Sequence, residues 1–271
     1  MKIAITGGSG FIGSALSALL REGGSEVVSL SRKDADVTGN RLSGIFNGCD
    51  CVVHLVGIIR ESGKSFDDVM VTGTKNVLNE CRNAGVKKIV YISASGVSLS
   101  RKERYYRAKL GAEKAIAESG IPYAILRPSI VYGPRGELTK MLKRLLAFPI
   151  VPVFGDGKYE LQPIHVDDLA RCIANAIGKN GVFEVGGNEK ISFKSLVTMM
   201  AKSVDKNPIF IHIPLWVARP IASIMSLIPF SPITREQLEI LINGNVCREN
   251  RIAELGVSPR PFNEGINFTK R

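Results

Sequence analysis

Short apolar runs alternate with longer amphipathic segments through the first two-thirds of the chain. The short runs are typical of buried strands, because each ends at a glycine, a proline or a polar residue. The longer segments repeat hydrophobic residues every three or four positions, as expected for a helix packed on a sheet. The expected strands are 2–6, 26–30, 51–56, 88–93, 123–127 and 182–185, and the expected helices are 11–21, 72–84, 104–119 and 167–177.

This alternation predicts an α/β fold with a parallel sheet and helices on both of its faces. From about residue 193 onward the alternation fades, and helical segments and prolines dominate. The change of pattern predicts a second, smaller part at the C-terminus.

A glycine-rich segment follows the first expected strand and opens the first expected helix. It contains Gly7, Gly10, Phe11, Ile12 and Gly13 in the order Gly-x-x-Gly-Phe-Ile-Gly. Gly7 permits a tight turn, Gly10 lets a pyrophosphate approach the backbone, and Gly13 lets the helix pack closely on the strand. The N–H groups at the start of the helix then face the phosphates. The segment therefore predicts a dinucleotide site.

Together with the alternating pattern, this loop predicts an α/β fold with a Rossmann-type doubly wound parallel sheet and a small, mostly helical C-terminal lobe. We expect an NAD(P)-binding Rossmann domain over residues 1–190, with residues 134–163 contributing to the substrate side. Residues 191–271 are expected to form a C-terminal substrate or lid lobe.

The end of the second strand bears on the choice of dinucleotide. NAD-binding proteins usually place an acidic residue there for the ribose 2′-hydroxyl. This chain has Ser31 and Arg32, followed by Lys33, which favours the 2′-phosphate of NADP(H) over NAD(H). Two alternatives stay open: the cations are solvated surface charges, or Asp34 or Asp36 serves the ribose of NAD(H).

These and other motifs resemble the extended and atypical short-chain dehydrogenase/reductases over nearly the whole chain. The further motifs are Asp36-Val37, His54-Leu55-Val56-Gly57, Gly73-Thr74-x-Asn76-Val77, Arg127-Pro128-Ser129-Ile130-Val131-Tyr132-Gly133-Pro134 and Gln162-Pro163-Ile164-His165-Val166-Asp167-Asp168-Leu169-Ala170. The resemblance implies that Asp36 and Val37 contact adenine. It also implies further cofactor contacts from Leu55, Val56, Gly57, Pro128 and Ser129.

Segments in the C-terminal part are similar to one subgroup of that family. They are Pro214-Leu215-Trp216-Val217-Ala218-Arg219, Thr234-Arg235-Glu236-Gln237-Leu238, Asn245-Val246 and Leu255-Gly256-Val257. The subgroup is related to the NADPH-binding accessory subunit of respiratory complex I and includes free-standing prokaryotic proteins.

Tyr105 and Lys109 have the family's Tyr-x-x-x-Lys spacing, which places both on one face of a helix. The ammonium is expected to lower the pKa of the phenol by favouring phenolate, and the resemblance implies that it also binds the nicotinamide ribose. Such a tyrosine exchanges a proton with a substrate oxygen while hydride moves to or from the nicotinamide. A solvated basic helix face is the competing interpretation.

Two positions depart from the family pattern. The run Ile92-Ser93-Ala94-Ser95 puts Ala94 where the family has a serine or threonine, so Ser95 or Ser93 is the candidate substitute. Met70 stands where the family commonly has asparagine.

The sequence thus favours an NADP(H)-dependent oxidoreductase or epimerase acting on a carbonyl or alcohol of unknown substrate. The alternative is a non-catalytic NADP(H)-binding structural or regulatory protein.

The chain carries a large excess of positive charge. Lys and Arg total 36 against 25 Asp and Glu, a net charge of +11, which indicates an anionic partner. NADP(H) accounts for part of it, but Arg135, Lys140, Lys143 and Arg144 fit either an anionic substrate or a solvated helix face. No aromatic–basic motif supports RNA binding, and the oligomeric state is not indicated.

The sequence predicts a cytoplasmic protein, with contact at a membrane surface as an open alternative. The N-terminus lacks a signal peptide, and the apolar stretch 209–230 is interrupted by prolines, His212 and Arg219. Trp216, Met225, Leu227 and Ile228 in this stretch fit lobe packing or, alternatively, a lipid or quinone pocket. The five cysteines and three histidines show no metal-ligand spacing, so we predict reduced thiols and no metal site.

Overall fold

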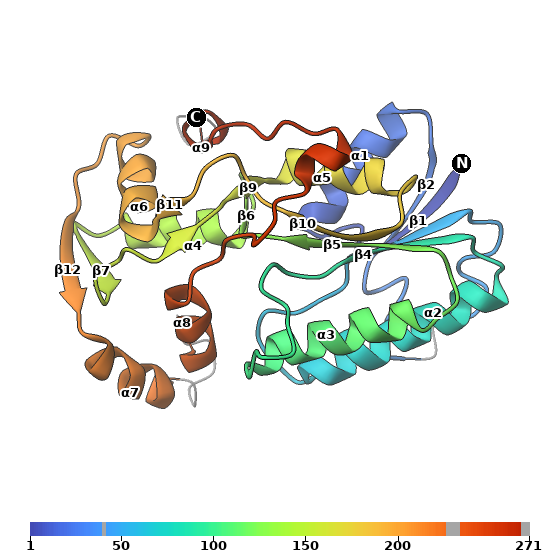
Figure 1. The fold of residues 1–271 in the computed structure, drawn as a ribbon, viewed down its shortest axis with the longest axis horizontal. Helices are drawn as coiled ribbons and strands as arrows, with labels where there is room; N and C mark the ends of the chain where they lie inside the picture. Colours follow the sequence, from blue (N-terminus) through green and yellow to red (C-terminus); the bar gives the residue numbers. More distant parts are fainter. Residues whose placement is uncertain (40–41, 226–233, 267–271) are drawn as a thin grey trace. The chain divides into compact units, whose positions relative to one another are not determined.

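A computed structural model of the chain describes residues 1–39, 42–225 and 234–266. It divides into two compact units (Figure 1). Unit 1 comprises residues 1–128, 166–185 and 248–258, and unit 2 comprises residues 129–165, 186–247 and 259–271. Leu227 and Ile228 lie outside the described residues.

Unit 1 is built on one six-stranded parallel sheet. The strand order is β10-β5-β4-β3-β1-β2, and the pairings between neighbours are all parallel. This confirms the predicted Rossmann-type sheet. The strands are β1 (Lys2–Thr6), β2 (Glu26–Leu30), β3 (Cys51–His54), β4 (Lys88–Ile92), β5 (Tyr123–Pro128) and β10 (Gly181–Val185).

Helices cover both faces of this sheet, as Figure 1 shows. Helices α1 (Phe11–Glu22) and α5 (Val166–Ala176) pack against each other on one face, and a π-helical turn η1 (Asp67–Thr72) with α2 (Gly73–Asn83) and α3 (Arg104–Ala117) covers the other. A short helix η2 (Ile252–Leu255) contacts α5 and β10. Because both faces are covered, the central strands are mostly apolar, and β3 is buried at every position.

The described residues of unit 2 form three two-stranded sheets and several helices. Its strands are β6 (Val131–Tyr132), β7 (Ile150–Phe154), β8 (Glu160–Leu161), β9 (Ile164–His165), β11 (Ile191–Ser192) and β12 (Ile209–Ile213). Its helices are α4 (Glu137–Leu145), α6 (Phe193–Lys202), α7 (Leu215–Met225), α8 (Arg235–Ile242) and α9 (Phe262–Gly265). A separate apolar core joins α4, α6, β7 and α9, with Leu142, Val153, Leu196 and Phe262 among its buried residues.

The division between the units differs from the single boundary predicted after residue 190. Residues 129–165 lie in unit 2, and residues 248–258 return to unit 1. The reason is local packing: Arg251 donates backbone and side-chain hydrogen bonds to β10, and η2 packs on α5. Hydrophobic periodicity shows which residues are buried, but not which distant element buries them. Among the described residues, no helix is both long and apolar enough to span a membrane.

Candidate functional site

The glycine-rich loop makes a tight turn between β1 and α1. Gly7 has a left-handed φ of +77°, and the Gly10 amide donates a 3.0 Å hydrogen bond to the Gly7 carbonyl. A Cβ on Gly13 would lie 2.3 Å from the Gly7 oxygen and 2.6 Å from the Gly8 Cα. Only glycine at position 13 therefore allows α1 to pack this closely on the loop.

The N-terminus of α1 offers an arrangement suited to an anion. Gly10 is the N-cap residue in an extended conformation, with no side-chain cap, and the first turn contains no acidic residue. The amides of Phe11, Ile12 and Gly13 belong to that first turn, whose N–H groups have no acceptor within the helix. A Cβ on Gly10 would approach only the Gly7 oxygen, at 3.0 Å. These residues fit the pyrophosphate of a dinucleotide.

The loop lies at the point where the strand order reverses. β1 is flanked by β2 on one side and by β3, the next strand of the sheet, on the other. Leu55 and Val56 follow β3 directly, and a Cβ on Gly7 would lie 3.5 Å from the backbone of both. Ligands of open α/β sheets bind in the crevice at such a switch point.

A series of buried hydrogen bonds through His54 joins the end of β3 to β1 and to α2. His54 Nδ1 lies 2.7 Å from the Thr6 hydroxyl, and Nε2 lies 3.1 Å from the Thr74 hydroxyl. Thr74 donates its own proton to the Met70 carbonyl at 2.5 Å. His54 Nε2 must therefore donate to Thr74, and Nδ1 must accept from Thr6. Burial, and then the charge of Lys109, lowers the pKa of His54 to about 3, so the ring is neutral.

At the end of β2, Ser31 is held by a carboxylate of its own loop. Asp34 Oδ2 accepts hydrogen bonds from the Ser31 amide at 2.9 Å and from its hydroxyl at 2.6 Å. The Ser31 hydroxyl is the main cause of a lowered pKa at Asp34. Arg32 is exposed. Within the described parts of the chain, Ser31 is thus engaged, whereas no hydrogen bond or ion pair is found for the Arg32 guanidinium.

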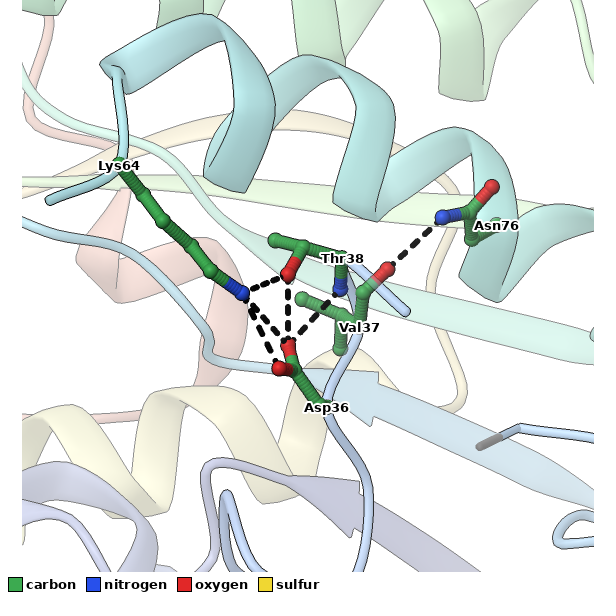
Figure 2. Close-up of polar contacts among 5 residues, drawn as sticks. All are labelled: Asp36, Val37, Thr38, Lys64 and Asn76. Carbon is green, nitrogen blue, oxygen red and sulfur yellow. Dashed lines mark hydrogen bonds and ion pairs between the residues drawn. The ribbon is translucent and has the colours of Figure 1, made fainter. Parts of the chain in front are cut away.

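Asp36 and Val37 lie in a polar cluster with a residue from a distant loop (Figure 2). Asp36 accepts from the Thr38 amide at 3.0 Å and hydroxyl at 2.8 Å, and Lys64 Nζ approaches its Oδ2 at 3.0 Å. The Thr38 hydroxyl, and then Lys64, lowers the pKa of Asp36 to about 2. The Val37 carbonyl accepts from Asn76 Nδ2 at 2.9 Å, which ties the pair expected to contact adenine to α2.

Lys109 is buried on α3 and directed toward the carboxyl end of β4. Its Nζ donates a 2.8 Å hydrogen bond to the Ile92 carbonyl and lies 5.0 Å from the centroid of the Tyr91 ring. A Cβ on Gly57 would lie 3.2 Å from this Nζ, so the segment after β3 reaches the ammonium. Burial lowers the pKa of Lys109 to about 8.

Tyr105 lies one turn before Lys109 and is half-buried against Phe66 and Tyr106. Burial, and then Tyr106, raises the pKa of its phenol above the ordinary value of 10. The expected lowering of this pKa by Lys109 is therefore wrong. The physical reason is that burial of the phenol, and then Tyr106, disfavours phenolate, while the Lys109 ammonium donates its hydrogen bond to the Ile92 carbonyl.

The hydroxyls after β4 lie inside the protein. Ser93 and Ser95 are buried, whereas Ala94 between them is partly exposed. The Ser93 hydroxyl has no hydrogen-bond partner within the described structure, and neither has the Tyr91 hydroxyl on the same strand. Met70 is fully buried in an apolar cluster with Phe66 and Ala108. Position 70 therefore contributes packing here.

Pro128 ends β5, and Ser129 begins unit 2. The Ser129 hydroxyl donates to the Gln162 carbonyl within unit 2. This buried hydrogen bond holds the segment before β6 to the segment before β9.

Sequence reasoning missed three parts of this site: the Lys64 contact with Asp36, the hydrogen-bonded chain through His54, and Tyr91 beneath Lys109. Lys64 is 28 residues from Asp36, and nothing in its neighbourhood marks it. The Gly-Thr-x-Asn motif did contain a signal, since Thr74 and Asn76 both bond to residues of the site.

The fold and the loop geometry together define a dinucleotide-binding α/β protein. The sequence model of the NAD dependent epimerase/dehydratase family matches residues 3–186. The chain therefore belongs to the NAD dependent epimerase/dehydratase family, which confirms its resemblance to the extended short-chain dehydrogenase/reductases.

Two curated relatives extend this result. An uncharacterized protein of Sinorhizobium fredii is 28% identical over 298 residues, which cover 96% of this chain and 75% of that protein. The mitochondrial NADH dehydrogenase (ubiquinone) 1 alpha subcomplex subunit 9 of Mus musculus is 27% identical over 222 residues. That match covers 78% of this chain but only 58% of the mouse protein. The similarity to a complex I subunit is thus confirmed, although the chain matches little more than half of that relative.

Solved structures show the same fold. UDP-glucose 4-epimerase of Thermus thermophilus in complex with NAD has a TM-score of 0.79 and 21% identity, covering 100% of this chain and 98% of the epimerase. A dTDP-glucose 4,6-dehydratase of Streptomyces venezuelae with NAD bound has a TM-score of 0.76 and 20% identity, covering 100% of this chain and 96% of the dehydratase. At these identities the likeness concerns the fold.

Proposed function

We propose that the protein binds NADP(H) at the carboxyl edge of the unit 1 sheet and acts as an oxidoreductase or epimerase on a carbonyl or alcohol. The observation that carries this proposal is the buried Lys109 ammonium, four residues after Tyr105 and hydrogen-bonded to the Ile92 carbonyl. A buried cation costs free energy, and such groups concentrate at functional sites. Lys109 also reaches the segment after β3, which borders the glycine loop.

Each part of the site would have a distinct task. The first-turn amides of α1 would hold the pyrophosphate, and Asp36 with the Val37 backbone would meet the adenine. Lys109 would bind the ribose next to the nicotinamide, which supplies hydride chemistry when the dinucleotide is bound. Because the pKa of Tyr105 is raised, this residue is a phenol at neutral pH. In the reducing direction it would donate that proton to the substrate oxygen.

Arg32 supports the preference for NADP(H). The Ser31 hydroxyl is already bonded to Asp34, so recognition of a 2′-phosphate falls to the exposed Arg32 guanidinium. The test is calorimetric titration of the wild type and of Arg32→Gln with NADPH and NADH. We expect Arg32→Gln to weaken NADPH binding about 10–100-fold and to leave NADH binding unchanged. The neighbouring Lys33→Gln variant is the matched control, and tighter binding of NADH than NADPH by the wild type would overturn the preference.

Catalysis is tested separately from binding. NADPH oxidation is followed with a panel of aldehydes and ketones, and interconversion of epimers with a panel of nucleotide sugars, because an epimerase regenerates its dinucleotide. The wild type is compared with Tyr105→Phe, and the neighbouring Tyr106→Phe is the control. We expect Tyr105→Phe to lower turnover by about 10²–10⁴-fold with unchanged NADPH affinity, which is the range of general acid–base catalysis. Equal turnover by the wild type and Tyr105→Phe would contradict the assigned role.

A second candidate is a protein that binds NADP(H) without turnover. The observation in its favour is that Ala94 is the partly exposed residue after β4, whereas the hydroxyls of Ser93 and Ser95 are buried. The buried Met70 offers no hydrogen bond to a substrate or water. The protein, which is similar to a subunit of NADH dehydrogenase (ubiquinone), would then use the dinucleotide to stabilise its own fold. Tight NADPH binding with no turnover across the panel would favour this candidate.

A further inference from the structure

One face of the small β7–β12 sheet in unit 2 is only half covered. Ile209 pairs with Ile150 and Ile213 pairs with Phe154 in this parallel pair, so these four residues lie on the same face. Phe154 and Ile213 pack against the α7–α8 cluster. The opposite face, with Val151 and Val153 buried, packs on the unit 2 core. The half of the first face at the start of the strands remains uncovered by the described elements.

The uncovered half carries large apolar side chains. Ile209 is 65% exposed, Ile211 48% and Ile150 47%, and Phe148 just before β7 is 69% exposed. We refer to these four residues as the apolar patch. Single exposed hydrophobic residues are ordinary, but a group of them on one sheet face is typical of an interaction site.

Cations gather at the ends of α4 and α6, the helices that precede β7 and β12 in the chain. Lys143 and Arg144 lie in the last turn of α4, and Lys202 lies in the last turn of α6. Lys206 Nζ donates to the Leu146 carbonyl at 2.6 Å, which joins the segment before β12 to the end of α4. Asp205 is the one acidic residue in the sequence stretches 140–155 and 199–225. We refer to Lys143, Arg144, Lys202 and Lys206 as the basic rim.

Helix α7 extends the apolar surface beside the patch. It packs through Ala218 and Ala222 on the side of Phe154 and Ile213, whereas Trp216 is 78% and Ile224 65% exposed. The interpretation of Trp216 as a residue of the lobe core is therefore wrong. The helix contains no acidic residue. An exposed tryptophan beside isoleucines suits the interface between water and lipid acyl chains.

We propose that this surface of unit 2 docks on an anionic lipid membrane. The apolar patch would enter the acyl boundary, and the basic rim would meet the lipid phosphates. The charge favours this partner, because a second copy of the chain would bring another basic rim against the first. The proposal is independent of the dinucleotide site, and it assigns a partner to Lys143 and Arg144, whose charges NADP(H) does not explain.

The chain contains its own reporter, since Trp216 is its one tryptophan. Full-length protein is mixed with vesicles of phosphatidylcholine alone or with about 30% phosphatidylglycerol. We expect co-flotation with the anionic vesicles, a blue shift of the tryptophan emission, and quenching by nitroxide-labelled lipid. Added salt should release the protein, because the rim charges are screened. Binding equal on both vesicle types, or absent from both, would overturn the proposal.

Two variants separate the contribution of the basic rim from that of the apolar patch. Lys143→Gln with Arg144→Gln should lower the vesicle partition coefficient about 25-fold, because each cation near an anionic surface contributes about fivefold. Ile209→Ser should lower partition about tenfold and reduce quenching. Matched controls in unit 1 are Lys114→Gln and Leu99→Ser, both at exposed positions, and they should bind as the wild type does. If the emission shift instead follows protein concentration without lipid and light scattering shows a dimer, the surface is a self-association interface and the proposal fails.

Discussion

The Lys109 ammonium donates a 2.8 Å hydrogen bond to the Ile92 carbonyl at the carboxyl end of β4. This bond links the helix that carries the Tyr-x-x-x-Lys motif to the edge of the sheet where the glycine loop lies. It also directs the charge into a buried environment next to the Tyr91 ring. The contact sets the proposed ribose-binding position of Lys109, and burial at this position lowers the pKa of its ammonium.

The first prediction concerns pH and the free energy of unfolding. The pKa of Lys109 is about 8 in the folded protein and 10.5 ordinarily. Between these values the unfolded chain binds more protons, so stability rises with pH through this window. At 1.36 kcal/mol for each tenfold change in proton affinity, the full effect is roughly 3 kcal/mol.

The measurement is urea unfolding of the wild type and Lys109→Met between pH 7.5 and about 10.5. The difference in unfolding free energy, wild type minus variant, should become more favourable to the wild type as pH rises. A difference that stays constant over this range would show that Lys109 has an ordinary pKa.

The second prediction separates packing from binding in the glycine loop. Gly13→Ala places a Cβ against the backbone of Gly7 and Gly8, which should destabilise the protein by about 3 kcal/mol or more. Gly10→Ala, at a φ of −71°, should change stability by less than about 1 kcal/mol but weaken dinucleotide binding about tenfold or more. Thermal unfolding and NADPH titration measure the two effects. Equal loss of stability in both variants would contradict this assignment.

The third prediction tests the hydrogen-bonded chain through His54. Thr74→Val removes the acceptor for the buried Nε2–H and should destabilise the protein by about 1–3 kcal/mol. Thr74→Ser keeps the hydroxyl and is the matched control, expected to cost distinctly less. In the wild type, nitrogen NMR of the imidazole should show the proton on Nε2. A proton on Nδ1 would contradict the inferred direction of both hydrogen bonds.

The fourth prediction concerns the carboxylate in Figure 2. The Thr38 hydroxyl is the larger cause of the low pKa of Asp36, and Lys64 is the second. Thr38→Val should therefore raise this pKa more than Lys64→Gln does, as measured by carbon NMR of the Asp36 carboxyl. Because the ion pair is partly exposed, Lys64→Gln should cost less than about 1 kcal/mol of stability. The reverse order of the two pKa effects would identify Lys64 as the main partner.

Local sequence was sufficient for the features that depend on neighbouring residues. Apolar runs bounded by glycine and proline predicted the strands of unit 1, and the spacing of Gly7, Gly10 and Gly13 predicted a loop geometry that the structure shows. Here each residue's role follows from its own backbone freedom, or from neighbours within one turn. The i, i+4 spacing likewise placed Tyr105 and Lys109 on one helix.

The features that depend on distant contacts were decided by tertiary structure. The Lys64–Asp36 pair, the tautomer of His54 and the return of residues 248–258 to unit 1 each join segments far apart in the chain. The pKa of Tyr105 rises because the phenol is buried, and spacing contains no information about burial. The sequence by itself determined the sheet, the loop and the candidate pair. Tertiary packing decided their partners, their protonation and which apolar face stays exposed, because burial is a property of the whole fold.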